Sequence, residues 1–228
     1  MGEKKQREET TKKIKKVLIV GACVIFVVLM VVSGMGSGWI TGLTTVKPGD
    51  AVVLDFTFYN SEGHPIITTD QQLWKTGVSS GNAPLLSKQI TVSANQTLAK
   101  SLFPVQVYTN TGWDQQFAVF TPEFTTITQG IIGMKVNEKK TIRIKTTTPM
   151  TQVWSADSLA RQNLNITDIS KGDLFTLGVS DSQNASATNN SAFSYIRTGE
   201  VTETGPTGVT VDLGYPTVDV SVVSINGR

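Results

Sequence analysis

The most informative pattern of apolar and polar positions lies between residues 121 and 145 of the chain. The stretch opens with Thr-Pro-Glu, residue types favoured where a helix begins because its first backbone N–H groups lack partners within the helix. Phe124, Ile127 and Ile131 then recur at the spacing of one helical face. Residues 141–145, TIRIK, alternate polar and apolar as a half-buried strand does. The pattern predicts a short helix that packs against the following strand.

Alternation also predicts strands early and late in the chain. Within residues 50–59, Phe56 and Phe58 share one face, and the Asn-Ser-Glu-Gly sequence that follows is typical of a hairpin turn. Residues 218–225 alternate in the same way. We expect this last strand to complete the main sheet by pairing with the strand at 141–145.

An unbroken apolar run, with no charged or strongly polar side chain, occupies residues 17–32. Because about 20 apolar residues cross a bilayer core, we predict a transmembrane signal anchor over 17–36, followed by a linker over 37–45. Residues 1–16 hold seven Lys or Arg and three Glu, which predicts a cytoplasmic N-terminus, with the bulk of the chain outside the cell membrane. Cleavage at the small residues 32–34 is the alternative.

The composition limits the kinds of partner and functional site that the chain can have. The chain has 228 residues and a formal net charge of +2, but the basic tail alone contributes +4, so the remainder is slightly acidic and nucleic acid is not an expected partner. Cys23 and His64 are the only residues of their types. A disulfide within the chain, a cysteine or multi-histidine metal site, and a Cys–His pair are therefore excluded, and we expect no cofactor. Cys23 suits a lipid-facing position, and His64 a solvated turn.

Four Asn-X-Ser/Thr sequons mark candidate glycosylation sites in a region rich in Thr, Ser, Asn and Gly. Each is a weak signal alone, but modification of at least one is consistent with the predicted export. The acceptor residues are Asn95, Asn165, Asn184 and Asn189.

Three blocks of the chain, in order, resemble those of FKBP-type peptidyl-prolyl cis-trans isomerases, in the SlyD-like and archaeal branch. The first is VKPGDAVVLDF at 46–56, and the second is IGMKVNEKKTIRI at 132–144. The third comprises GEVT at 199–202 and GVTVDLGYPTVDVSV at 208–222.

The resemblance implies an α+β fold, a curved antiparallel sheet around one short helix with an inserted β-rich flap domain. The FKBP-like domain would cover residues 46–152, with an atypical insertion at 70–116. The insert-in-flap domain would cover 153–213, and 214–228 would return as the final strand. An unrelated β-sandwich is the alternative fold, since short alternating strands would suit it too.

The resemblance also implies an apolar pocket for a prolyl residue. Ile67 stands where the family has a carboxylate, and Phe56 where it has a tyrosine, so the usual polar groups are missing. Phe117 or Phe120 would supply one aromatic wall of the pocket. Val218 or Val220 stands in the place of the family's last aromatic residue. Each residue could equally be core, and for Ile127 and Val220 we favour core. The pocket residues taken by resemblance are Phe56, Ile66, Ile67, Phe117, Phe124, Ile127, Met150 and Val218.

Two functions follow from the resemblance. A prolyl isomerase needs no titrating group, because the barrier of roughly 18–20 kcal/mol comes from amide resonance and an apolar wall favours the twisted amide. The first function is thus a membrane-anchored, extracytoplasmic isomerase and chaperone acting on unfolded or proline-containing polypeptides. The second is a catalytically degenerate holdase or scaffold subunit of a membrane or cell-surface complex.

Overall fold

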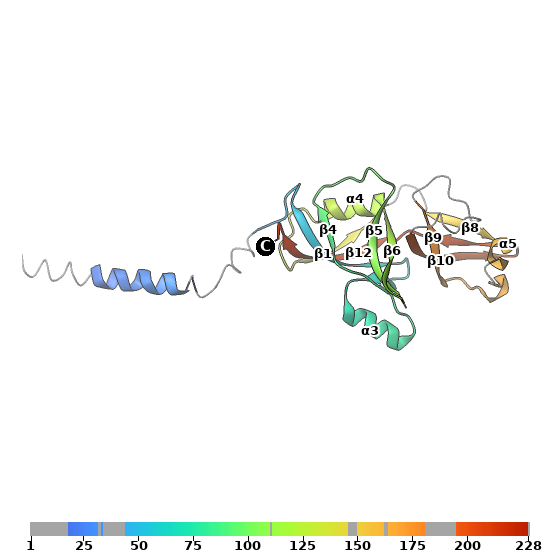
Figure 1. Ribbon diagram of the computed structural model, residues 1–228, viewed down its shortest axis with the longest axis horizontal. Helices are drawn as coiled ribbons and strands as arrows, with labels where there is room; N and C mark the ends of the chain where they lie inside the picture. The colour runs from blue at the N-terminus through green and yellow to red at the C-terminus, as the bar shows by residue number, and fades with distance from the viewer. Residues whose placement is uncertain are drawn as a thin grey trace, which may run out of the picture. The chain divides into compact units, whose positions relative to one another are not determined.

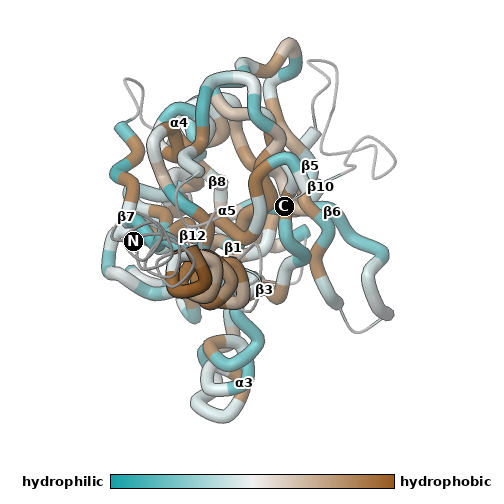
Figure 2. Tube along the Cα trace, turned by 90° about the vertical axis from the view of Figure 1, so that its left-hand side faces the viewer, coloured by the Kyte–Doolittle hydropathy of each residue, from teal (hydrophilic) through white to brown (hydrophobic). Residues whose placement is uncertain are grey.

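The chain divides into two compact units, residues 1–44 and 45–228. In the first, residues 18–31 form a helix, and Figure 2 shows that its residues are mostly apolar. The second unit holds two β-sheets and a few short helices (Figure 1). The computed structural model describes residues 18–31, 33, 44–109, 111–145, 150–161, 164–180 and 195–227.

The predicted transmembrane anchor over 17–36 is contradicted. Among the residues described, no helix combines the length and the apolar character needed to cross a membrane. The single-pass location in the cell membrane, which depended on that anchor, is contradicted with it.

The first sheet has the strand order β3-β2-β1-β12-β7, with β4 pairing the first half of β1. A register shift between Val53 and Leu54 marks a bulge in β1, a feature that bends a strand. The expected curved sheet is thus present. Its strands are β1 (Ala51–Tyr59), β2 (Pro65–Thr68), β3 (Leu85–Leu86), β4 (Ile90–Ser93), β7 (Lys139–Arg143) and β12 (Thr217–Ile225).

The central pairing of this sheet confirms the expected return of the last strand. β12 pairs antiparallel with β1 on one side and with β7 on the other, where Val218 lies opposite Ile142. The helix predicted after residue 121 is α4 (Thr121–Gly130), and its apolar face packs into the core of this sheet. Its N-cap is Phe120 rather than the expected Thr121.

The second sheet has the order β5-β6-β10-β11-β8, with β9 pairing β10. Residues 70–116, expected to be an insertion of unknown role, contribute strands to both sheets and the helix α3 (Gln71–Ser80). The strands are β5 (Leu102–Thr109), β6 (Gly112–Phe120), β8 (Thr151–Ser155), β9 (Leu174–Val179), β10 (Tyr195–Gly205) and β11 (Gly208–Asp212), accompanied by α5 (Ala156–Ala160) and a 3₁₀ turn (Ile166–Asp168).

The α+β class with a transmembrane helix is therefore wrong, because the chain is mostly β. The physical reason lies largely in residues 70–116, which supply strands to both sheets where an insertion of unknown role was expected. The larger core lies between α4 and the first sheet, and the smaller one is built on β9, β10 and β11.

Candidate functional site

The residues expected to line a prolyl pocket are almost all brought together, but as closed core. Seven of the eight belong to the larger core, and each is at most 3% exposed. Met150 instead packs against the smaller core. The seven are Phe56, Ile66, Ile67, Phe117, Phe124, Ile127 and Val218.

Neighbouring side chains fill the space beside these residues. The ring of Phe103 lies with its centroid 4.7 Å from that of Phe124, and the ring of Phe58 lies edge-on to Phe56 at 5.7 Å. The ring of Phe117 stacks on Tyr215 at 6.2 Å. The walls formed by these rings therefore face packed neighbours.

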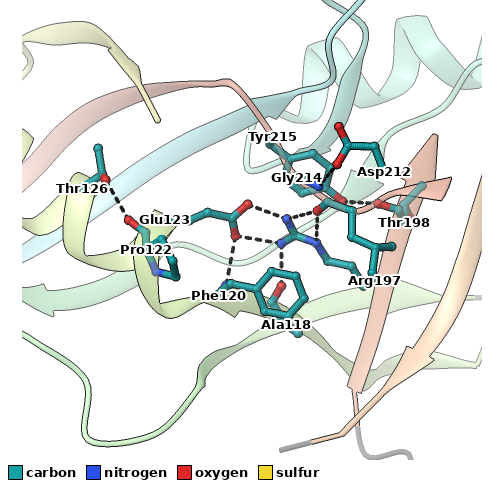
Figure 3. Close-up of polar contacts among 11 residues, drawn as sticks. Ala118, Phe120, Pro122, Glu123, Thr126, Arg197, Thr198, Asp212, Gly214 and Tyr215 are labelled. Carbon is teal, nitrogen blue, oxygen red and sulfur yellow. Dashed lines mark hydrogen bonds and ion pairs between the residues drawn. The ribbon is translucent and has the colours of Figure 1, made fainter. Parts of the chain in front are cut away.

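An ion pair lies buried at one end of this core. Arg197, on β10, and Glu123, in the first turn of α4, are both 0% exposed (Figure 3). The guanidinium donates to both carboxylate oxygens, with Nη1 2.9 Å from Oε2. It also donates to the backbone carbonyls of Ala118 and Leu213. The same carboxylate accepts the backbone N–H of Phe120 at 2.9 Å and so caps the helix.

Three aromatic rings surround the guanidinium. Its central carbon lies 3.8 Å from the ring centroid of Tyr215, 4.5 Å from that of Phe120 and 5.2 Å from that of Phe117. Burial alone would lower the pKa of Arg197, but Glu123 and Tyr215 outweigh burial, and the pKa is raised. Burial also raises the pKa of Tyr215. Both groups therefore keep their protonated forms at neutral pH.

The ion pair has a structural consequence. Glu123 belongs to the helix over the first sheet, Arg197 to a strand of the second, and Leu213 to the link between β11 and β12. The hydroxyl of Tyr215 adds a hydrogen bond of 2.6 Å to the carbonyl of Thr198. With both carboxylate oxygens and the guanidinium nitrogens bonded, the cluster ties the two sheets together.

A separate cleft of about 490 Å³ lies on the outer face of the first sheet. At its floor Asp219 accepts hydrogen bonds from the hydroxyls of Tyr59 and Thr141. Burial, and then the charge of Asp219, raise the pKa of Tyr59. Among the expected pocket residues only Phe56 borders this cleft, so it does not replace the predicted prolyl pocket.

The strand β8 leaves one side open. Its only described strand partner is β11. Its sequence, TQVWS, contains neither charge nor proline, and Val153 is 74% exposed. The edge strand β7 of the first sheet instead carries Lys139, Lys140 and Arg143, the kind of charge that discourages pairing with other chains. On β8 the indole Nε1 of Trp154 is buried and has no hydrogen-bond partner among the described residues.

The remaining sequence-derived candidates are scattered. His64 lies exposed in a hairpin turn, as expected, 3.6 Å from Glu62. Asn95 and Asn165 are exposed, whereas the sequons at Asn184 and Asn189 fall outside the described residues. Within the described ranges no three His, Cys, Asp or Glu side chains gather as a metal site would require.

The features that sequence reasoning missed share a cause. Glu123 and Arg197 are 74 positions apart and no motif links them, while the open edge of β8 depends on which strands pair.

Compared with models of protein families and with the sequences of curated proteins, the chain matches none.

Proposed function

We propose that this chain binds extended polypeptide segments, as a holdase or scaffold, and does not catalyse prolyl isomerisation. The proposal rests on a difference between the expected prolyl pocket and the strand β8. The residues expected to line a prolyl pocket are closed core, whereas β8 offers an uncharged strand edge with an exposed apolar side chain.

Catalysis at the expected pocket would require the core to open. Seven of its residues are at most 3% exposed, and the Arg197–Glu123 pair holds α4 against β10 beside them. Opening the core would therefore have to separate this hydrogen-bonded pair as well as the packed side chains. The carboxylate and hydroxyl groups that the family resemblance implies are also replaced, by Ile67 and Phe56.

The open edge of β8 suits an added strand. An extended peptide gains backbone hydrogen bonds along such an edge whatever its sequence, and alternate side chains then decide which peptides are preferred. On β8, Val153 lies opposite Thr210 and points away from the smaller core, so an apolar side chain of the ligand would meet it. The FKBP resemblance is consistent with this role, because it implies that the segment 153–213 holds unfolded chains by their apolar stretches.

The experiment uses the full chain and follows aggregation of a chemically unfolded client protein by light scattering. We expect the chain to suppress aggregation and Val153→Lys to lose most of that effect, because a charge at an edge opposes strand addition. Val153→Thr, which keeps a β-branched residue without charge, is the matched control and is expected to retain it. If Val153→Lys suppressed aggregation as well as the unchanged chain, the site would be wrong.

A proline-limited refolding assay with the same protein separates this role from isomerisation. We expect no acceleration of the slow refolding phase. Acceleration that scaled with the concentration of the chain would support the isomerase prediction and overturn the proposal.

A further inference from the structure

Three aromatic side chains from three different elements form a row, here called the aromatic ladder. Trp74 comes from α3, Tyr108 from β5 and Trp113 from β6. The ring centroids of Trp74 and Tyr108 lie 6.4 Å apart, and those of Tyr108 and Trp113 lie 5.5 Å apart. Figure 1 shows α3 set off from the sheets, near one end of the β5–β6 hairpin. None of the three residues belongs to either apolar core.

The ladder is accessible and holds unused hydrogen-bond donors. Tyr108 is 43% exposed and Trp113 is 37% exposed. Neither the indole N–H groups of Trp74 and Trp113 nor the hydroxyl of Tyr108 has a hydrogen-bond partner in the described part of the chain. Indole nitrogens can only donate, so they match a ligand rich in acceptors.

The polar groups around the ladder are already held in place. The ammonium of Lys88 lies 5.1 Å from the ring centroid of Trp113 and donates to the side-chain oxygen of Gln106 at 2.8 Å. The carboxylate of Asp114 accepts hydrogen bonds from the hydroxyls of Thr109 and Thr111. The acceptors on Gln106 and Asp114 are therefore engaged, while the indoles and the remaining ammonium hydrogens can still donate.

Ring orientation narrows the class of ligand further. Trp74 and Tyr108 meet at 84°, and Tyr108 and Trp113 meet at 64°. Rings at such angles pack edge to face, whereas stacking on the flat face of a sugar would favour coplanar rings. The exposed surfaces of the Tyr108 and Trp113 rings suit a compact apolar group such as the pyrrolidine of proline.

We propose that the aromatic ladder binds a proline-rich segment in the polyproline II conformation. Such a segment presents pyrrolidine rings, lacks N–H groups at its prolines and leaves its carbonyls free to accept hydrogen bonds. These properties complement perpendicular rings that carry free donors, and aromatic-lined grooves recognise this conformation in other proteins. The ladder lies apart from β8 and from the closed core, and binding here involves no isomerisation.

A ligand at the ladder would also stabilise α3. None of the ten residues of this helix is buried. Its N-cap Asp70 accepts the backbone N–H groups of Gln72 and Leu73, and Trp74 contacts Tyr108. Because a short helix without a buried face is marginal in water, we expect ligand binding to increase the protection of α3 amides against hydrogen exchange.

The test uses full-length ¹⁵N-labelled protein and a short oligoproline peptide, with a Gly-Ser peptide of equal length as the control ligand. We expect oligoproline to shift the indole N–H signals of Trp74 and Trp113 while those of Trp39 and Trp154 stay in place. Trp113→Ala should weaken binding about tenfold, since truncating a hot-spot tryptophan costs more than 1 kcal/mol and 1.4 kcal/mol corresponds to a factor of ten.

Two further variants decide between explanations. Trp113→Phe keeps a ring but removes the donor, and we expect an affinity between those of the unchanged chain and Trp113→Ala. Leu174→Ala, at an exposed apolar residue of β9, should leave affinity unchanged. Equal binding of the Gly-Ser peptide, shifts with an oligosaccharide but not with oligoproline, or no indole shifts at all would each overturn the proposal. Val153→Lys should still bind oligoproline, so this result is independent of the proposed strand-edge function.

Discussion

Removing one member of the buried ion pair is the most demanding test of how the two sheets are joined. Glu123→Ala would leave the guanidinium of Arg197 charged, 0% exposed and bonded only to the carbonyls of Ala118 and Leu213. Leaving such a charge unpaired costs about 3–5 kcal/mol. The same change removes the acceptor for the backbone N–H of Phe120, which adds about 1 kcal/mol.

This loss is a large fraction of the total free energy of unfolding, which is about 5–15 kcal/mol for a typical domain. Equilibrium unfolding in urea, followed by intrinsic fluorescence, measures it directly. With a denaturant slope of about 2 kcal/mol per molar urea, we expect the unfolding midpoint to fall by about 2 M. Burial alone would lower the pKa of Arg197, but Glu123 outweighs it and the pKa is raised, so the guanidinium stays charged at neutral and mildly alkaline pH. The shift should therefore be the same at pH 6 and at about pH 9.

A double variant separates charge from volume. Glu123→Leu combined with Arg197→Met removes both charges and keeps apolar volume, and replacing a buried pair in this way is often neutral or stabilising. We expect the double variant to be clearly more stable than Glu123→Ala. A single variant that cost less than about 1 kcal/mol, or a double variant as unstable as the single one, would refute the reasoning that an unpaired buried charge dominates.

Two further predictions concern close packing and a surface carboxylate. A Cβ at Gly208 would lie 2.4 Å from the carbonyl oxygen of Trp154. Gly208→Ala should therefore lower the free energy of unfolding in urea by about 1–3 kcal/mol. Gly205→Ala is the control and should be nearly neutral, because a Cβ there would have its nearest contact at 3.7 Å. The pKa of Asp50 is lowered first by the side chain of Asn226, so Asn226→Ala should raise that pKa towards its ordinary value of 3.8 in a carboxyl NMR titration. Because the lowered pKa favours the folded state above about pH 4 and the benefit fades as pH falls through the folded value, the variant should be less stable at neutral pH, and its difference from the unchanged chain should narrow in acid.

Several elements followed from the order of residues alone. The spacing of Phe124, Ile127 and Ile131 predicted α4, and the alternation over 50–59 and 218–225 predicted β1 and β12. These patterns succeed because one face of each element is buried, and burial imposes the period of a helix or a strand on the sequence. The run at 17–32 correctly predicted a helix, but not a membrane span.

Tertiary structure alone decided what the buried faces contact. Periodicity shows that Phe56 and Phe124 point inward, yet an apolar side chain looks the same in sequence whether it faces a ligand or another side chain, and here both face packed neighbours. The pairing of Glu123 with Arg197, the open side of β8 and the aromatic ladder each join segments distant in the chain. Local patterns carry no information about such contacts, because they arise only when the sheets have assembled.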